Sequence, residues 1–160
     1  MLLHSKQRGD VKIFDFGLAR SLPTSSKPDD TYHLSGMVGS LRYMAPEVAN
    51  GQPYNLKCDV YSLSVLLWEV LALTKPYAKD SEPKKFIKKV IQGGTRPKIQ
   101  PEWPATVKTL LAKGWTPNVE ARYTMREVNE ALATELGRRS LTRDPSAYSR
   151  RRSTFVFRKK

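Results

Sequence analysis

Four groups of residues in this chain are of types that carry out chemistry or hold a reactive segment in place. Asp15-Phe16-Gly17 follows an alternating stretch, Ala45-Pro46-Glu47 follows a long loop, and Asp59 and Arg122 come later. A carboxylate such as that of Asp15 is a hard oxygen ligand, the type that Mg²⁺ prefers. Taken alone, an aspartate at the end of a strand is better explained by an ordinary turn, in which its side chain accepts a local hydrogen bond. The meaning of these residues therefore depends on the elements that position them.

Strands are predicted before Asp15, and the first long helix is predicted after Pro46. Val11–Phe14 alternates apolar and polar residues, which predicts a strand with Leu2-Leu3 as its hairpin partner. Asp59 is predicted to cap a central helix that ends at Lys75-Pro76. The helix carries apolar residues on nearly all of its faces, so it should be the buried centre of the domain. Its expected stripe contains Val60, Leu63, Leu67, Val70 and Leu71.

Three more helices are predicted in the second half of the chain. The first starts at Ser81-Glu82-Pro83 and stops at Gly93-Gly94, and the second covers 105–113. The third opens with a capping box formed by Thr124 and Glu127, and continues to about Leu136. The fold class is therefore mainly α (α+β), with a short β-hairpin and about five to six helices.

The ordered set of motifs resembles the second half of a eukaryotic protein kinase catalytic domain. The run Gly39–Glu47 is similar to the tyrosine-kinase-like group of Ser/Thr kinases. The likeness covers residues 2–137 and implies a kinase C-terminal lobe without its N-terminal lobe. Residues 1–137 are accordingly interpreted as a partial kinase domain, and 138–160 as a basic tail. One departure is Ser64, which stands where the family often has glycine.

The resemblance implies that the protein uses ATP and Mg²⁺. It gives Asp15 the role of Mg²⁺ ligand, places Phe16 beneath the site, and makes Gly17 the point where the backbone turns sharply. Leu2 would form the floor of the adenine pocket. The expected cofactor-binding residues are therefore Leu2, Asp15, Phe16 and Gly17, with Asp15 as the metal ligand.

The segment between Asp15 and Glu47 corresponds to a kinase activation segment. Ser35 is the first candidate for phosphorylation by an upstream kinase and Thr31 is a weaker one; the alternative is that these are solvated loop hydroxyls. The resemblance places Ser40 and Tyr43 beside the peptide substrate, which favours a Ser/Thr acceptor over tyrosine.

Two further roles are implied for residues outside that segment. Glu47 and Arg122 match the family's buried ion pair, and removing either partner should cost roughly 3–5 kcal/mol. Asp59, besides capping the central helix, would hydrogen-bond the backbone of the catalytic loop.

Several parts of a working kinase are not found in these 160 residues: the Gly-rich loop, the strand lysine, its helix glutamate, the His-Arg-Asp loop and the metal-binding Asn. We therefore expect a protein Ser/Thr kinase by family, acting on protein substrates, but no phosphotransfer by this chain alone. On this interpretation Met1 could be an internal methionine of a longer protein. The alternative is a kinase-derived interaction module without catalysis.

Charge is concentrated at the C-terminal end. The chain has a formal net charge of +13, and residues 138–160 hold nine Lys or Arg residues against one acidic residue. This tail could bind nucleic acid or an acidic membrane, or it could be a solvated, disordered extension. No run approaches the roughly 20 apolar residues of a membrane helix. The lone Cys58 fits a reducing compartment, so an intracellular location is expected, in the cytoplasm or the nucleus.

Overall fold

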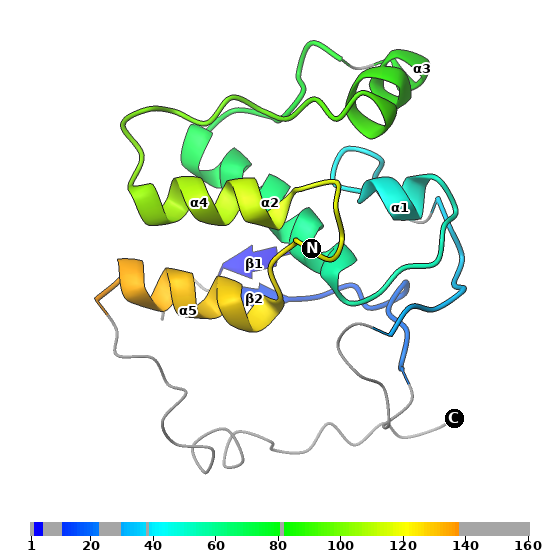
Figure 1. Cartoon of the computed structure of the whole chain (residues 1–160), viewed down its shortest axis with the longest axis horizontal. Helices are drawn as coiled ribbons and strands as arrows, with labels where there is room; N and C mark the ends of the chain where they lie inside the picture. Colours follow the sequence, from blue (N-terminus) through cyan, green and yellow to red (C-terminus); the bar gives the residue numbers. More distant parts are fainter. Residues whose placement is uncertain (1, 5–10, 23–29, 38, 81, 138–160) are drawn as a thin grey trace.

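The computed structural model describes residues 2–4, 11–22, 30–37, 39–80 and 82–137, and this part of the chain is mainly helical, as predicted (Figure 1). Within these described ranges, two short strands precede five α-helices and one π-helical segment. The elements are β1 (Leu2–His4), β2 (Val11–Ile13), α1 (Pro46–Ala49), α2 (Lys57–Ala72), α3 (Pro83–Phe86), η1 (Ile87–Gln92), α4 (Ala105–Gly114) and α5 (Met125–Glu135).

The predicted hairpin is present. Strands β1 and β2 pair antiparallel, with Leu2 opposite Ile13 and His4 opposite Val11. Helices α1 and α3 begin at Pro46 and Pro83. Proline is favourable in the first turn, because an N–H at that position would have no partner within the helix.

The start of α2 differs from the prediction, because Asp59 does not cap this helix. The helix begins at Lys57, and Asp59 lies in its first turn. The side-chain oxygen of Asn55 accepts a hydrogen bond from the Lys57 backbone N–H at 3.0 Å, so an earlier residue satisfies a free donor. Asp59 still places a negative charge near the positive end of the helix dipole, which is favourable.

The end of α2 also differs from the prediction. The helix stops at Ala72, before Lys75-Pro76, because Leu73 adopts a left-handed conformation with φ 50°. Val70 and Leu71 were expected in the buried stripe, but their side chains are 58% and 40% exposed. The first half of α2 therefore provides the buried centre of the fold, and its last turn does not.

Helix α4 packs against α2 on one side and against α5 on the other (Figure 1). The core on α2 contains Tyr61, Val65 and Trp68, and Trp115 lies in the same cluster, as expected of core aromatics. A smaller cluster joins Val60 to α4 and α5. The predicted capping box at the start of α5 is confirmed: the Thr124 hydroxyl and the Glu127 carboxylate each bind the other's backbone N–H.

Candidate functional site

The segment that begins at Asp15 runs along the surface of the molecule. Asp15 itself has φ 69°, an uncommon conformation for a residue other than glycine. Gly17 follows in a turn closed by the Ala19 N–H, which donates to the Phe16 carbonyl at 3.0 Å. The turn expected at Gly17 is present, although the positive φ belongs to Asp15.

Phe16 does not pack beneath a site, contrary to the expectation. Its side chain is 66% exposed, and that of Leu18 is 60% exposed. The side chain of Leu2 is not described, so its expected contact with a nucleotide stays a prediction.

A pair of tyrosines fastens the next part of this segment to the loop before α2. The backbones of Tyr32 and Tyr54 form an antiparallel bridge, with N–H to O distances of 2.9 and 3.1 Å. The Tyr54 hydroxyl also donates to the Ser35 carbonyl at 3.1 Å. Thr31 and Ser35 are both exposed beside this bridge. Their hydroxyls are therefore open to solvent while the backbone around them is held.

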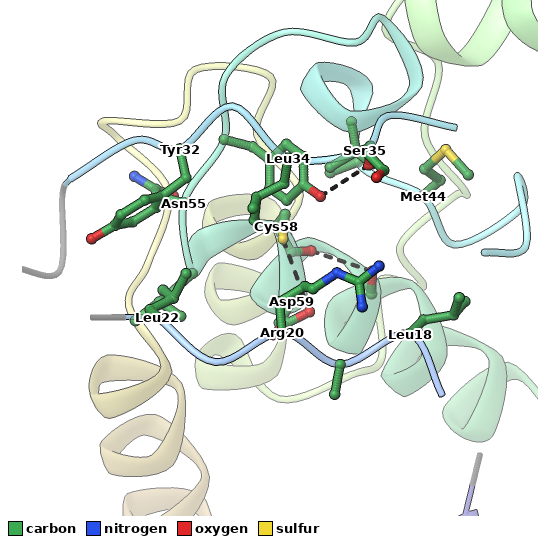
Figure 2. A pocket seen from close by; sticks show the side chains of 16 residues that line it. Leu18, Arg20, Leu22, Tyr32, Leu34, Ser35, Met44, Asn55, Cys58 and Asp59 are labelled. Atoms are coloured by element: carbon green, nitrogen blue, oxygen red, sulfur yellow. Dashed lines mark hydrogen bonds between the residues drawn. The ribbon is translucent and has the colours of Figure 1, made fainter. Parts of the chain in front are cut away.

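A pocket of about 250 Å³ lies between this segment and the start of α2; we call it the Asp59 pocket. Figure 2 shows Leu18, Arg20 and Leu22 on one side and Tyr32, Leu34 and Ser35 on the other, with Cys58 and Asp59 between them. Its wall thus comes from residues 18–22, 32–35, 44–48 and 54–62. Segments that are distant in sequence converge on the first turn of α2.

Two of the α2 side chains that line the Asp59 pocket, Cys58 and Asp59, have raised pKa values. Burial, followed by the nearby carboxylates of Asp59 and Glu47, raises the pKa of the Cys58 thiol to about 12. The thiol therefore stays protonated and unreactive. Asp59 keeps some contact with solvent, but desolvation by the pocket wall raises the pKa of its carboxyl, an effect that the hydrogen bond with Cys58 partly opposes.

The segment 40–44 is held from three directions. The Arg42 guanidinium donates to the Pro76 carbonyl beyond α2. The Tyr43 hydroxyl donates to Glu69 Oε2 at 2.5 Å, and the Ser62 hydroxyl donates to the Tyr43 carbonyl at 2.8 Å. Burial and the bond to Glu69 raise the pKa of Tyr43 to about 12. These contacts fix the backbone just after Ser40, which is itself exposed.

Glu47 and Arg122 form a buried ion pair. Arg122 Nη1 and Nη2 lie 2.5 and 3.1 Å from the two carboxylate oxygens of Glu47. The guanidinium also donates to the carbonyls of Thr116 and Lys57 and lies over the ring of Tyr61, 5.3 Å from its centroid. The arginine side chain is fully buried. Without these partners its charge and its N–H donors would be buried unpaired, which would cost free energy of folding.

Several residues of this site were not singled out from the sequence. Tyr54 and Asn55 sit in a loop without periodicity, where the adjacent Pro53 was the only local signal. Glu69 lies in a helix whose apolar residues dominated the pattern. Tail residues 138–160, with their proposed nucleic-acid or membrane contacts, lie outside the described residues.

The residues present could hold part of a nucleotide–metal site. The Asp15 carboxylate is exposed and of the right chemistry for Mg²⁺. Among the described residues, however, no group of three His, Cys, Asp or Glu side chains is placed to hold a metal ion. Asp15 can thus contribute one ligand, and these residues do not complete the site.

The motifs and their geometry define a class of protein. The family model "Protein tyrosine and serine/threonine kinase" matches residues 1–132, which is most of the chain. The chain therefore belongs to the protein kinase family. Within that family it is of the tyrosine-kinase-like type.

Three curated relatives show how the chain compares with whole proteins. It is 39% identical over 127 residues to "Dual specificity protein kinase shkB" of Dictyostelium discoideum, covering 78% of this chain and 19% of that protein. It is 34% identical over 118 residues to "Mitogen-activated protein kinase kinase kinase 7" of Homo sapiens, with 74% and 18% covered. A Drosophila melanogaster protein, "Putative mitogen-activated protein kinase kinase kinase 7-like", is 35% identical over 140 residues, with 84% and 33% covered. The chain thus spans a third or less of each relative.

None of the helices in the described residues is both long enough and apolar enough to span a bilayer.

Proposed function

We propose that residues 1–137 are the C-terminal lobe of a protein Ser/Thr kinase domain. The observation that carries this proposal is the Glu47–Arg122 ion pair, which fastens the end of the segment begun by Asp15 to the helical body. The same body holds Tyr43 and leaves Ser40 exposed, as a surface for a protein substrate requires. We assign Ser40 and Tyr43 to that surface.

Phosphoryl transfer depends on positioning and on neutralising the charge of the triphosphate. When bound, ATP with Mg²⁺ supplies the phosphoryl group and the metal charge. In this chain Asp15 would hold the metal, with Leu2, Phe16 and Gly17 beside the nucleotide. Residues from outside this chain would have to complete the cradle, because the Gly-rich loop, the lysine and the His-Arg-Asp loop are not among its 160 residues.

It follows that the chain alone should not transfer phosphate, since the missing groups provide most of the positioning and electrostatic stabilisation. The test incubates the purified chain with radiolabelled ATP, Mg²⁺ and a generic protein substrate, with Asp15→Ala as the matched control. Equal background in both samples is expected. Transfer by the parent chain above that of Asp15→Ala would overturn the proposed inactivity.

A chimera tests the kinase assignment and the acceptor type separately. The kinase-domain residues that precede the matched region in the shkB relative would be joined to this chain at the aligned position. We expect the chimera to label peptides that contain Ser or Thr, to leave Tyr peptides unlabelled, and to lose activity in Asp15→Ala. A folded chimera that labels only Tyr peptides would refute the Ser/Thr assignment.

Ser35 is proposed as an activating phosphorylation site, with Thr31 as the second candidate. Its side chain is exposed, and its backbone carbonyl accepts a hydrogen bond from the Tyr54 hydroxyl. A phosphate on Ser35 would therefore act on a segment whose backbone is already attached to the loop before α2. Phosphopeptide mapping of the active chimera, with Ser35→Ala as the control, tests the assignment. Activation that persists in both Ser35→Ala and Thr31→Ala would contradict it.

A non-catalytic interaction module is the second candidate function. The exposed side chains of Phe16 and Leu18 favour it, because apolar groups left open to solvent are available to a partner. The chimera distinguishes the two functions: an inactive but folded chimera would favour the module.

A further inference from the structure

The helix formed by α3 and η1 carries a concentration of positive charge. Lys84, Lys85, Lys88 and Lys89 lie within six residues, and all four side chains are exposed. A shallow hollow beside them is lined by three of these lysines and by the acidic Asp80, together with Gly93 and Thr95. We call these four side chains the lysine face.

The opposite side of the same helix is firmly attached to the fold. Phe86, Val90 and Ile91 are buried in the main core. The ring of Phe86 meets that of Tyr77 edge-on, with centroids 5.2 Å apart. Segment η1 also packs against α1, the helix that contains Glu47 (Figure 1). The lysine face is therefore presented on a rigid support, which lowers the entropic cost of binding.

The lysine arrangement is unfavourable for the helix itself. Lys84 and Lys88, and likewise Lys85 and Lys89, are like charges at i and i+4, a spacing that destabilises a helix. Lys84 and Lys85 also lie near the N-terminal end of this helix, where the dipole favours negative charge; the N-cap residue Glu82 offsets this for Lys85, with which it pairs.

Neighbouring acids neutralise only half of the lysine face. Lys89 contacts both Asp80 oxygens at 3.0 Å, and Lys85 pairs with Glu82 at 2.8 Å. Within the described ranges, Lys84 and Lys88 have no ion pair. Among the described residues, no carboxylate neutralises these two exposed side chains, which lie about one helical turn apart.

We propose that the lysine face binds an acidic segment of a partner protein. Two carboxylates spaced by about one helical turn would match Lys84 and Lys88. Single-stranded nucleic acid is a poorer match, because the exposed side chains of this helix include no aromatic ring on which a base could stack. This binding does not depend on phosphotransfer, so it goes beyond the proposed kinase function.

The test uses the full chain and a short fluorescein-labelled peptide in which glutamate alternates with serine, followed by fluorescence anisotropy at low ionic strength. The variant is Lys84→Glu/Lys88→Glu. Its matched control is Lys113→Glu/Arg126→Glu, which changes the net charge equally at exposed positions on α4 and α5. Thermal melting by circular dichroism checks that each variant is folded, and Lys84→Gln/Lys88→Gln provides a milder change.

We expect the peptide to bind the parent chain and to bind Lys84→Glu/Lys88→Glu about tenfold more weakly, while the control stays within about twofold. The Gln variant should lie between them. Equal weakening in the variant and its charge-matched control would overturn the proposal, as would no binding by the parent. So would binding that survives in the lysine variant but is lost on deleting 138–160. Duplex DNA that binds through these lysines when the peptide does not would also overturn it.

Discussion

Replacing Glu47 with Gln should destabilise the protein far more than replacing an exposed acidic partner. The change leaves the buried Arg122 guanidinium without its counter-charge, although three bonds to the carbonyls of Thr116 and Lys57 remain. Removing one partner of a buried pair costs roughly 3–5 kcal/mol. Because the remaining carbonyl bonds retain part of the solvation of Arg122, we expect about 3 kcal/mol for Glu47→Gln.

Arg122→Met should cost more, about 5 kcal/mol, because it strands the Glu47 carboxylate and also leaves buried carbonyls without donors, at about 1 kcal/mol each. In the double variant neither charge is stranded. Its cost should therefore fall short of the sum of the two single changes by about 2–3 kcal/mol. Since a whole domain is stable by only about 5–15 kcal/mol, Glu47→Gln is the primary measurement.

The assay is urea unfolding followed through the fluorescence of the buried Trp68 and Trp115, from which the free energy of unfolding is extrapolated. The control is Glu82→Gln, which removes a pair to Lys85 whose side chains are 52% and 76% exposed; it should cost less than about 0.5 kcal/mol. If Glu47→Gln costs no more than Glu82→Gln, or if the double-variant cycle shows no coupling, the reasoning about the buried pair is wrong.

Three other changes test local features. A Cβ on Gly114 would lie 1.9 Å from Ser64 Oγ, so Gly114→Ala should cost about 1–3 kcal/mol in urea unfolding, yet little when Ser64→Gly is also present. Thr124→Ala should cost about 1 kcal/mol. Hydrogen bonds from Thr124 lower the pKa of Glu127, so the stabilisation by the ionised Glu127 carboxylate is present above the ordinary carboxyl pKa and is lost as the pH falls below it. Melting curves across acidic pH should show that loss in the parent chain and not in Thr124→Ala. Burial raises the pKa of Asp59, so stability should fall as pH rises through the range above 3.8, and Asp59→Asn should flatten that slope in the same melting series.

Local signals were the most reliable guides to the fold. The capping box at Thr124 and Glu127 acts within one helical turn, and it appears where the pattern placed it. The start of α2 was misplaced because Asp59 and Asn55 are both suitable capping residues. Which of them satisfies the first free N–H depends on the backbone of the preceding loop. Sequence patterns do not contain that geometry.

Non-local features of the candidate site could be predicted only where a family motif indicated them. The resemblance indicated the pairing of Glu47 with Arg122. No motif indicated the bridge between Tyr32 and Tyr54, since two loop residues without periodicity carry no signal for pairing. The exposure of Phe16 was also missed, because a motif gives a residue's role in a complete domain and not the surface available around it in this chain.

Glu47 and Arg122 are 75 residues apart, and this separation has a consequence for folding kinetics. A single turn such as the one at Thr124 can form within about a microsecond, whereas the ion pair must wait until a long intervening loop has closed. We therefore expect the segment around Glu47 to dock after the rate-limiting step. Stopped-flow measurements should then find that Glu47→Gln speeds unfolding while the refolding rate hardly changes.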